Sequence, residues 1–69
     1  MDYKIIGNNL LAHLKRQNKT QTDLANHLNK SKQSVNNIIN GKNKIKLDEL
    51  ISILDYLELE LYDIIKEII

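Results

Sequence analysis

The sequence contains no cysteine and no proline, and only two of its 69 residues are glycine. Without cysteine the chain cannot form a disulfide, and two histidines alone do not make the Cys/His cluster that a structural metal needs. No secretory signal is recognisable, and no apolar run approaches the roughly 18 residues of a membrane span. We therefore expect a soluble protein in a reduced, cytoplasmic setting, without metal or cofactor, folded as one domain over residues 1–69.

The charge is small overall but unevenly distributed along the chain. The formal net charge is +1 at pH 7, yet residues 1–46 carry a net charge of +7 and residues 47–69 a net charge of −6. A basic half and an acidic half in so small a domain indicate that one surface meets a polyanion, while the other faces solvent or another subunit.

Helix-breaking residues are scarce, so capping residues must mark where helices begin and end. Apolar side chains recur every three or four positions over residues 5–18, which predicts a first helix. Thr20, with Asp23 three residues later, has the spacing of a capping box and predicts the start of a second, short helix. Asn29 can take the left-handed turn that ends it.

A third short helix is expected to begin at Ser31 and to stop at Asn40. Gly41 can adopt the positive φ angle that is typical just past a helix end. The inward apolar stripe of this helix consists of Val35, Ile38 and Ile39.

Two more helices are predicted in the acidic half. Residues 47–57 carry one apolar face, from which Ile53 is excluded. Residues 57–61 alternate as a half-buried strand would, but helical spacing returns from Leu61 onwards. We favour a turn and then a last helix from about Glu60, with a strand as the alternative, so the expected fold is an all-α, compact bundle of five helices. The expected apolar face of residues 47–57 consists of Leu47, Leu50, Ile51, Leu54 and Leu57.

The second and third helices are joined by a turn of three or four residues, as in a helix-turn-helix unit. Their sequence, TQTDLANHLNKSKQSVNNIINGK, resembles the Cro and phage-repressor (lambda-repressor-like, XRE) family of bacterial regulators, and the likeness continues into LELELYDII. The resemblance implies a DNA-binding domain whose third helix enters the major groove. The positions at the family's spacing are Gln21, Leu24, Ala25, Leu28, Ser31, Val35, Ile38 and Gly41.

The third helix carries a polar row away from its apolar stripe. Each asparagine in it costs the helix about half a kcal/mol relative to Ala. An amide can pair two-pronged with adenine and a lysine can donate to guanine, each good pair contributing about 1–3 kcal/mol of discrimination. The alternative is compositional, because nine Asn, eleven Ile and nine Lys against one Arg indicate a coding bias. The row consists of Lys32, Gln33, Asn36, Asn37 and Asn40.

The resemblance also implies individual DNA contacts. Gln21 would bind a backbone phosphate and buttress Gln33, and Ser34 would lie near a phosphate or a base edge. The implied base-reading residues are Lys32, Gln33, Asn36 and Asn37. Phosphate contacts would come from the loop residues Asn40, Lys42, Asn43 and Lys44, although a merely solvated loop is the alternative for the two lysines. For Lys15, Arg16 and Lys19 a solvated surface is the better interpretation.

Some positions depart from the family pattern. Leu14 and Ile39 stand where members usually carry a buried Arg–Glu pair, and replacing both partners with apolar side chains is often neutral or stabilising. We therefore predict that Leu14 contacts Ile39. Lys19 and Lys30 stand where apolar residues are usual, and each is expected to bury its stem while its ammonium group reaches water.

The family implies a transcriptional regulator, most simply a Cro-like repressor that binds a palindromic operator in double-stranded DNA as a homodimer through its C-terminal helices. Ile53, Ile68 and Ile69 are the expected exposed apolar residues of that dimer interface. No small-molecule effector is evident. The alternative is a helical protein-interaction module, such as an antitoxin or the controller subunit of a larger complex. An enzyme is disfavoured, since no catalytic motif or phosphate-binding loop is present.

Overall fold

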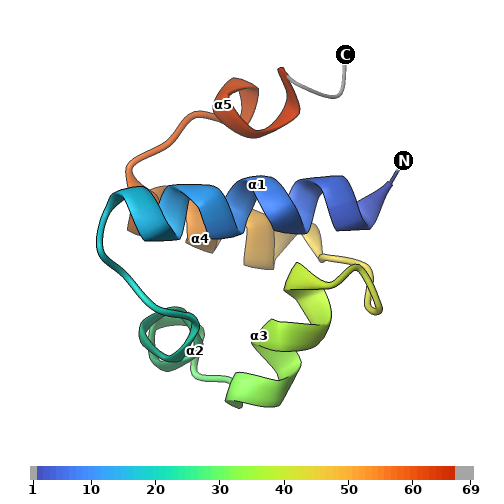
Figure 1. The fold of residues 1–69 in the computed structure, drawn as a ribbon, viewed down its shortest axis with the longest axis vertical. Helices are drawn as coiled ribbons and strands as arrows, with labels where there is room; N and C mark the ends of the chain where they lie inside the picture. The colour runs from blue at the N-terminus through green and yellow to red at the C-terminus, as the bar shows by residue number, and fades with distance from the viewer. Residues whose placement is uncertain (1, 67–69) are drawn as a thin grey trace.

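The computed structural model describes residues 2–66 and shows five α-helices with no strand among them (Figure 1). None of the helices in this part of the chain is both long and apolar enough to cross a membrane. The all-α prediction is confirmed. The helices are α1 (Tyr3–Arg16), α2 (Gln21–Leu28), α3 (Lys32–Ile39), α4 (Leu47–Leu57) and α5 (Leu61–Ile65).

The first helix is shifted two residues towards the N-terminus from its predicted bounds. It begins earlier because the Asp2 carboxylate accepts a hydrogen bond from the Lys4 N–H at 2.9 Å and caps the helix. It ends earlier because Asn18 adopts a left-handed φ of 58° and the Lys19 N–H returns to the Leu14 carbonyl at 2.9 Å. A capping carboxylate and a left-handed turn, and not the apolar spacing, thus set the two ends of α1.

The capping predictions for α2 and α3 are confirmed. The Asp23 N–H donates to Thr20 Oγ1 at 3.1 Å, and the Thr20 N–H donates to Asp23 Oδ2 at 2.8 Å, which completes the capping box. Asn29 adopts a left-handed φ of 57° at the end of α2. Ser31 caps α3 through a 3.1 Å hydrogen bond from the Ser34 N–H.

A turn, and not a strand, connects α4 to α5. Glu58 has a left-handed φ of 57°, and the Leu59 N–H donates to the Leu54 carbonyl at 2.9 Å. The Glu60 N–H then donates to Asp63 Oδ2 at 2.8 Å, so that Glu60 is the N-cap of α5. The strand alternative for residues 57–61 is wrong, because these local hydrogen bonds close a helix end and open the next helix.

In Figure 1, α1 crosses the middle of the molecule with α4 behind it; α5 lies on one side of α1, and α2 and α3 lie on the other. Two side-chain amides tie α1 to the acidic half. Asn9 donates to the Ile64 carbonyl at 2.8 Å, and Gln17 donates to the Leu57 carbonyl at 2.7 Å. The α2–α3 pair is therefore held at one end of the molecule by a scaffold of α1, α4 and α5.

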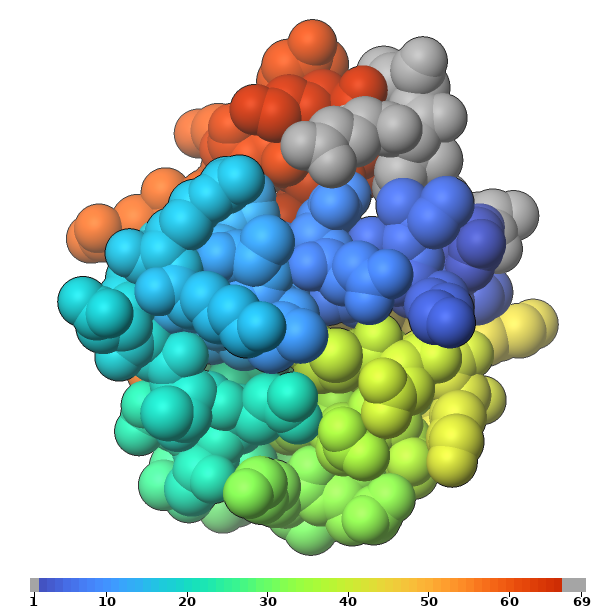
Figure 2. Space-filling view, viewed as in Figure 1, coloured from blue at the N-terminus to red at the C-terminus, as the bar shows by residue number. Residues whose placement is uncertain are grey.

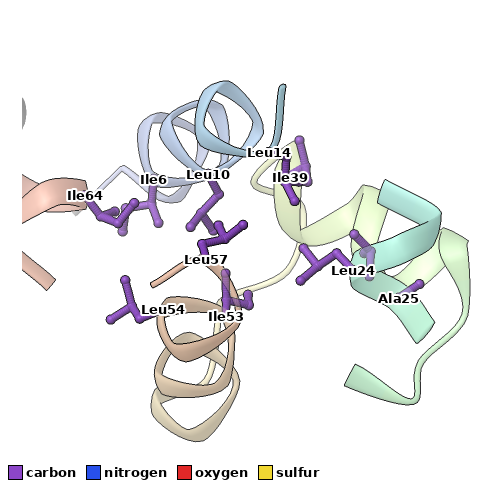
Figure 3. Packing of buried hydrophobic residues seen from close by; sticks show 11 residues of the cluster. Ile6, Leu10, Leu14, Leu24, Ala25, Ile39, Ile53, Leu54, Leu57 and Ile64 are labelled. Atoms are coloured by element: carbon purple, nitrogen blue, oxygen red, sulfur yellow. The ribbon is translucent and has the colours of Figure 1, made fainter. Parts of the chain in front are cut away.

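One apolar cluster fills the space between the helices (Figure 3). Leu14 is fully buried and Ile39 is 2% exposed, and Figure 3 shows their side chains together between α1 and α3. This position agrees with the predicted apolar pair. The buried cluster consists of Ile6, Leu10, Leu14, Leu24, Ala25, Val35, Ile39, Ile53, Leu54, Leu57 and Ile64.

The predicted apolar face of α4 is partly wrong. Ile53 is fully buried, whereas Leu47 is 71% exposed and Ile51 is 51% exposed. The stripe that packs inward runs from Leu50 through Ile53 to Leu57, with Leu54 beside it, and it also has helical i, i+3, i+4, i+7 spacing. The apolar arc of α4 is wider than the core needs, and packing against the other helices selects which part is buried.

Both glycines lie where α1 meets the C-terminal end of α3. A Cβ at Gly7 would overlap the backbone carbonyl of Ile39. Gly41 has the predicted positive φ, 75°, and a Cβ there would lie 2.8 Å from the backbone nitrogen of Lys4. These contacts place the start of α1 directly against α3 and the loop that follows it.

Candidate nucleic-acid interface

The third helix presents two different surfaces. Val35, Ile38 and Ile39 are buried, while Gln33 and Asn40 are exposed on the side away from them. Each of the ten residues expected to contact DNA reaches the surface. Lys32, Gln33, Asn40, Lys42, Asn43 and Lys44 are exposed, and Gln21, Ser34, Asn36 and Asn37 are half-buried.

The start of α2 and the start of α3 lie side by side and share a surface hollow of about 310 Å³. Gln21 is the first residue of α2, and the other lining residues belong to the first half of α3. Figure 2 shows α2 and α3 together forming the end of the molecule opposite α5. The structure thus brings together four of the expected residues, namely Gln21, Lys32, Gln33 and Asn36.

Three other expected residues lie on the opposite flank of α3. Ser34, Asn43 and Lys44 line a second hollow, of about 220 Å³, together with Lys30 and Lys46. The Ser34 hydroxyl accepts a hydrogen bond from Ser31 Oγ at 3.0 Å, so it is part of the helix cap. The expected site is therefore divided by α3 into a flank facing α2 and a flank facing the loop before α4.

The Gln33 side chain is held by its own helix. Its Nε2 donates to Asn37 Oδ1, one turn further along α3, at 3.1 Å. Gln21 lines the same hollow as Gln33, but the hydrogen bond of the Gln33 amide goes to Asn37. The buttress expected from Gln21 is thus supplied by Asn37, because residues four apart are neighbours on a helix surface.

Backbone hydrogen bonds fix the loop after α3. The Asn37 carbonyl accepts from the Lys42 N–H at 2.9 Å and from the Asn43 N–H at 3.3 Å. The close approach of Lys4 to Gly41 adds an exposed lysine from α1 beside this loop. Lys4 was missed from the sequence, because only the packing of α1 against the loop brings it there.

The turn between α2 and α3 is tied to α4 by a salt bridge. Lys30 Nζ lies 2.8 Å from Glu49 Oε2, and Glu49 Oε1 accepts from the Lys46 N–H at 3.0 Å. Burial raises the pKa of Glu49, but the hydrogen bonds from Lys30 and Lys46 and the positive charges of these two lysines together outweigh burial and hold this pKa below its ordinary value. The Lys30 side chain remains exposed, as expected, but its ammonium group also binds a partly buried carboxylate, which the sequence did not predict.

Tyr56 of α4 contacts two further side chains, those of Lys19 and His27. Lys19 Nζ lies 4.3 Å from the centre of the Tyr56 ring and 3.1 Å from the Tyr56 carbonyl oxygen. The His27 ring stacks on Tyr56 with 4.4 Å between ring centres, and its Nε2 lies 3.3 Å from Ser52 Oγ. Lys19, between α1 and α2, and His27 of α2 therefore contact α4 and do not belong to the polar row on α3.

Two short helices, packed at one end of a helical scaffold and joined by a tight turn, define a helix-turn-helix DNA-binding domain. A sequence model of the family described as "Helix-turn-helix" matches residues 10–64. The chain belongs to this family, in its lambda-repressor-like (XRE) form, which confirms the resemblance seen in the sequence. No curated protein and no solved structure matches the chain.

Proposed function

We propose that this protein is a sequence-specific, DNA-binding transcriptional regulator that inserts α3 into the major groove. The observation that carries the proposal is the exposed polar row of α3, which is held by a buried apolar stripe on the opposite side of the same short helix. Amide and lysine side chains match the hydrogen-bonding groups of base edges in the major groove.

Within this proposal some surface residues contact bases and others contact phosphates. Gln33, Asn36 and Lys32 face the bases, Asn37 lies beside Gln33 on the same surface, and Gln21 binds a phosphate at the start of α2. Phosphate contacts set the register of the protein on DNA and do not read sequence. Ser34 lies near a phosphate or a base edge. The further phosphate-binding residues are Asn40, Lys42, Asn43 and Lys44, to which the position of Lys4 beside Gly41 adds one more.

The charge distribution supports this orientation. The net positive charge of residues 1–46 belongs to the segment that contains α2, α3 and the loop after them, whereas seven of the nine acidic residues lie in residues 47–69, the segment that contains α4 and α5. A polyanion is attracted to the first segment and repelled by the second. Binding to DNA should therefore weaken steeply as salt rises.

We further propose that the protein is a repressor that binds a palindromic operator as a homodimer through α4 and α5. Four apolar side chains of these helices are exposed, which supports a contact there. A two-fold dimer would place two recognition helices about 34–36 Å apart on one face of DNA. Ile53 is buried and takes no part, and Ile68 and Ile69 lie outside the described residues. The exposed side chains are Leu47, Ile51, Leu61 and Tyr62.

The same exposed side chains support the second candidate function. An antitoxin or controller subunit would use Leu47, Ile51, Leu61 or Tyr62 to bind a different protein. Activator function would use the same fold and the same DNA contacts. These roles differ in what happens after binding and not in how α3 would read DNA.

Selection from random duplexes, followed by gel shifts on the selected sequence, tests the proposed function. We expect one preferred duplex, bound far more tightly than bulk competitor, with affinity that falls as salt rises. Sizing of the complex counts the subunits bound. Equal binding to all duplexes, or none, would instead favour the protein-interaction module.

A further inference from the structure

The hydrogen bond from Gln33 Nε2 to Asn37 Oδ1 joins two side chains on the exposed surface of α3. Gln33 is exposed and Asn37 is half-buried, so the 3.1 Å bond lies at the edge of the proposed reading surface. The main chain of Asn37 is itself fixed, because its carbonyl accepts two N–H groups from the loop after α3. The backbone of Asn37 is thus held at the end of α3 from which its side chain reaches Gln33.

The groups that this bond leaves free determine what Gln33 can bind. A glutamine amide has two N–H donors and one carbonyl acceptor. One N–H is used by Asn37, so one N–H and Oε1 remain. A donor beside an acceptor is the pattern that pairs with N7 and N6 of adenine, whereas guanine presents two acceptors at the same edge.

In the observed bond Asn37 presents its Oδ1 to Gln33, and against this acceptor the Gln33 amide has one favourable orientation. If the Gln33 amide rotated by half a turn, its Oε1 would face Asn37 Oδ1, and two acceptors would oppose each other with no hydrogen between them. The unrotated amide keeps Oε1 pointing away from Asn37. An Oε1 held in that position accepts from the adenine amino group and repels the O6 atom of guanine.

We propose that Gln33 and Asn37 act as one recognition unit for adenine, in which Gln33 touches the base and Asn37 is the residue that positions the Gln33 amide. The proposal rests on the proposed function, since it needs α3 in the major groove. A purely structural role predicts something different: Asn37 would add slightly to the stability of α3, as i, i+4 amide pairs do, without affecting base preference.

The Gln33–Asn37 unit is tested by measuring affinities for two versions of the selected duplex, which carry adenine or guanine at the base that Gln33 contacts. We expect wild type to prefer adenine about tenfold or more. Gln33→Ala should abolish the preference, and Asn37→Ala should remove most of it although Gln33 is still present. The double variant should show no further loss, because the two residues act together.

Two control variants separate positioning from general damage. Asn37→Asp keeps an acceptor for Gln33 Nε2, so it should retain the adenine preference while its negative charge lowers the affinity for every duplex. Asn36→Ala removes a neighbouring amide from the same helix. It should leave unchanged the ratio of affinities for adenine and guanine at the base that Gln33 contacts. Circular dichroism should report the same helix content for all of these variants.

The outcomes distinguish failure of the unit from failure of the proposed function. If Asn37→Ala keeps the wild-type preference, or if the two single variants act additively at different base positions, the unit is wrong while DNA recognition stands. If wild type binds all duplexes alike, both are wrong. In the free protein, Asn37→Ala should also shift the side-chain amide resonance of Gln33, and an unmoved resonance would contradict the bond itself.

Discussion

Lys30 Nζ lies 2.8 Å from Glu49 Oε2, which joins the turn of the helix-turn-helix unit to the first turn of α4. The Glu49 side chain is only 10% exposed, and its other oxygen accepts the Lys46 N–H. A single carboxylate therefore caps α4 and holds the turn that sets α3 relative to α2. The salt bridge therefore adds a polar contact between the α2–α3 turn and α4 to the apolar packing that holds α3.

The salt bridge predicts a specific dependence of stability on pH. The pKa of Glu49 is below its ordinary value of 4.5, so the stability that Glu49 contributes is present above that value and is lost as pH falls through the folded-state pKa. Hydrogen bonding to Glu49 raises the pKa of Lys30, so the contribution of Lys30 is present below its ordinary value and is lost at high pH.

Urea unfolding of wild type and Glu49→Gln between pH 7 and pH 2 measures this dependence. Wild type should be the more stable protein at neutral pH, and the difference should shrink as the pH falls. Asp23, whose pKa is held down by its hydrogen bonds with Thr20, should leave part of the acid dependence in the variant. A difference that stays constant with pH would contradict the role of Glu49.

The packing of α1 on α3 predicts that Gly7 cannot be enlarged. Gly7→Ala would gain about 1 kcal/mol of helix propensity at an exposed site. Here the added Cβ overlaps the Ile39 carbonyl, so we expect a net loss of about 2 kcal/mol in the free energy of unfolding. The matched control is Asn8→Ala, at an exposed position of the same helix. Equal stability of the two variants would show that α1 and α3 are not in close contact.

The assignment of phosphate contacts predicts how single lysines affect binding. Lys42→Ala should weaken binding to all duplexes alike and should reduce the slope of log affinity against log salt by about 1. Lys4→Ala should act in the same way, since Lys4 lies beside the same loop. The control is Lys66→Ala, which should leave binding unchanged. Lys66 is the C-cap of α5, and α5 lies on the other side of α1 from α3 (Figure 1). A change in base preference from Lys42→Ala would move that residue into the base-reading group.

The exposed apolar residues of α4 predict a separable effect on assembly. Leu47→Ser with Ile51→Ser should leave the stability of the monomer nearly unchanged, because both side chains are largely exposed, but it should weaken the proposed dimer. Ile53→Ala should instead lower the free energy of unfolding by about 2–5 kcal/mol, because that side chain is fully buried. Analytical ultracentrifugation at several concentrations measures assembly, and an unchanged dimer would exclude this face of α4.

Features that depend on neighbouring residues were predictable from the sequence. The caps at Thr20 and Ser31 and the left-handed turn at Asn29 require only groups within a few residues of one another. The apolar stripe of α3 was predictable for the same reason, and it defined which side chains of this helix could face a partner.

Features that depend on distant residues were not predictable. Ile53 and Ile51 are equally apolar, and only the docking of α4 decides that Ile53 is buried. The partners of Lys30 and Lys19 lie 19 and 37 residues further along the chain, in α4, so no local pattern links them. The direction of the Gln33 amide likewise depends on side-chain geometry that spacing alone does not contain.

The most direct test of the account follows the side-chain amide resonances of Gln33 and Asn37 while the selected duplex is added to the protein. If α3 enters the major groove, both resonances should move and reach a limit at stoichiometric DNA, while the resonances of α5 residues stay in place and a scrambled duplex produces smaller shifts. Unmoved Gln33 and Asn37 resonances in a saturated complex would contradict the insertion of α3 into the major groove.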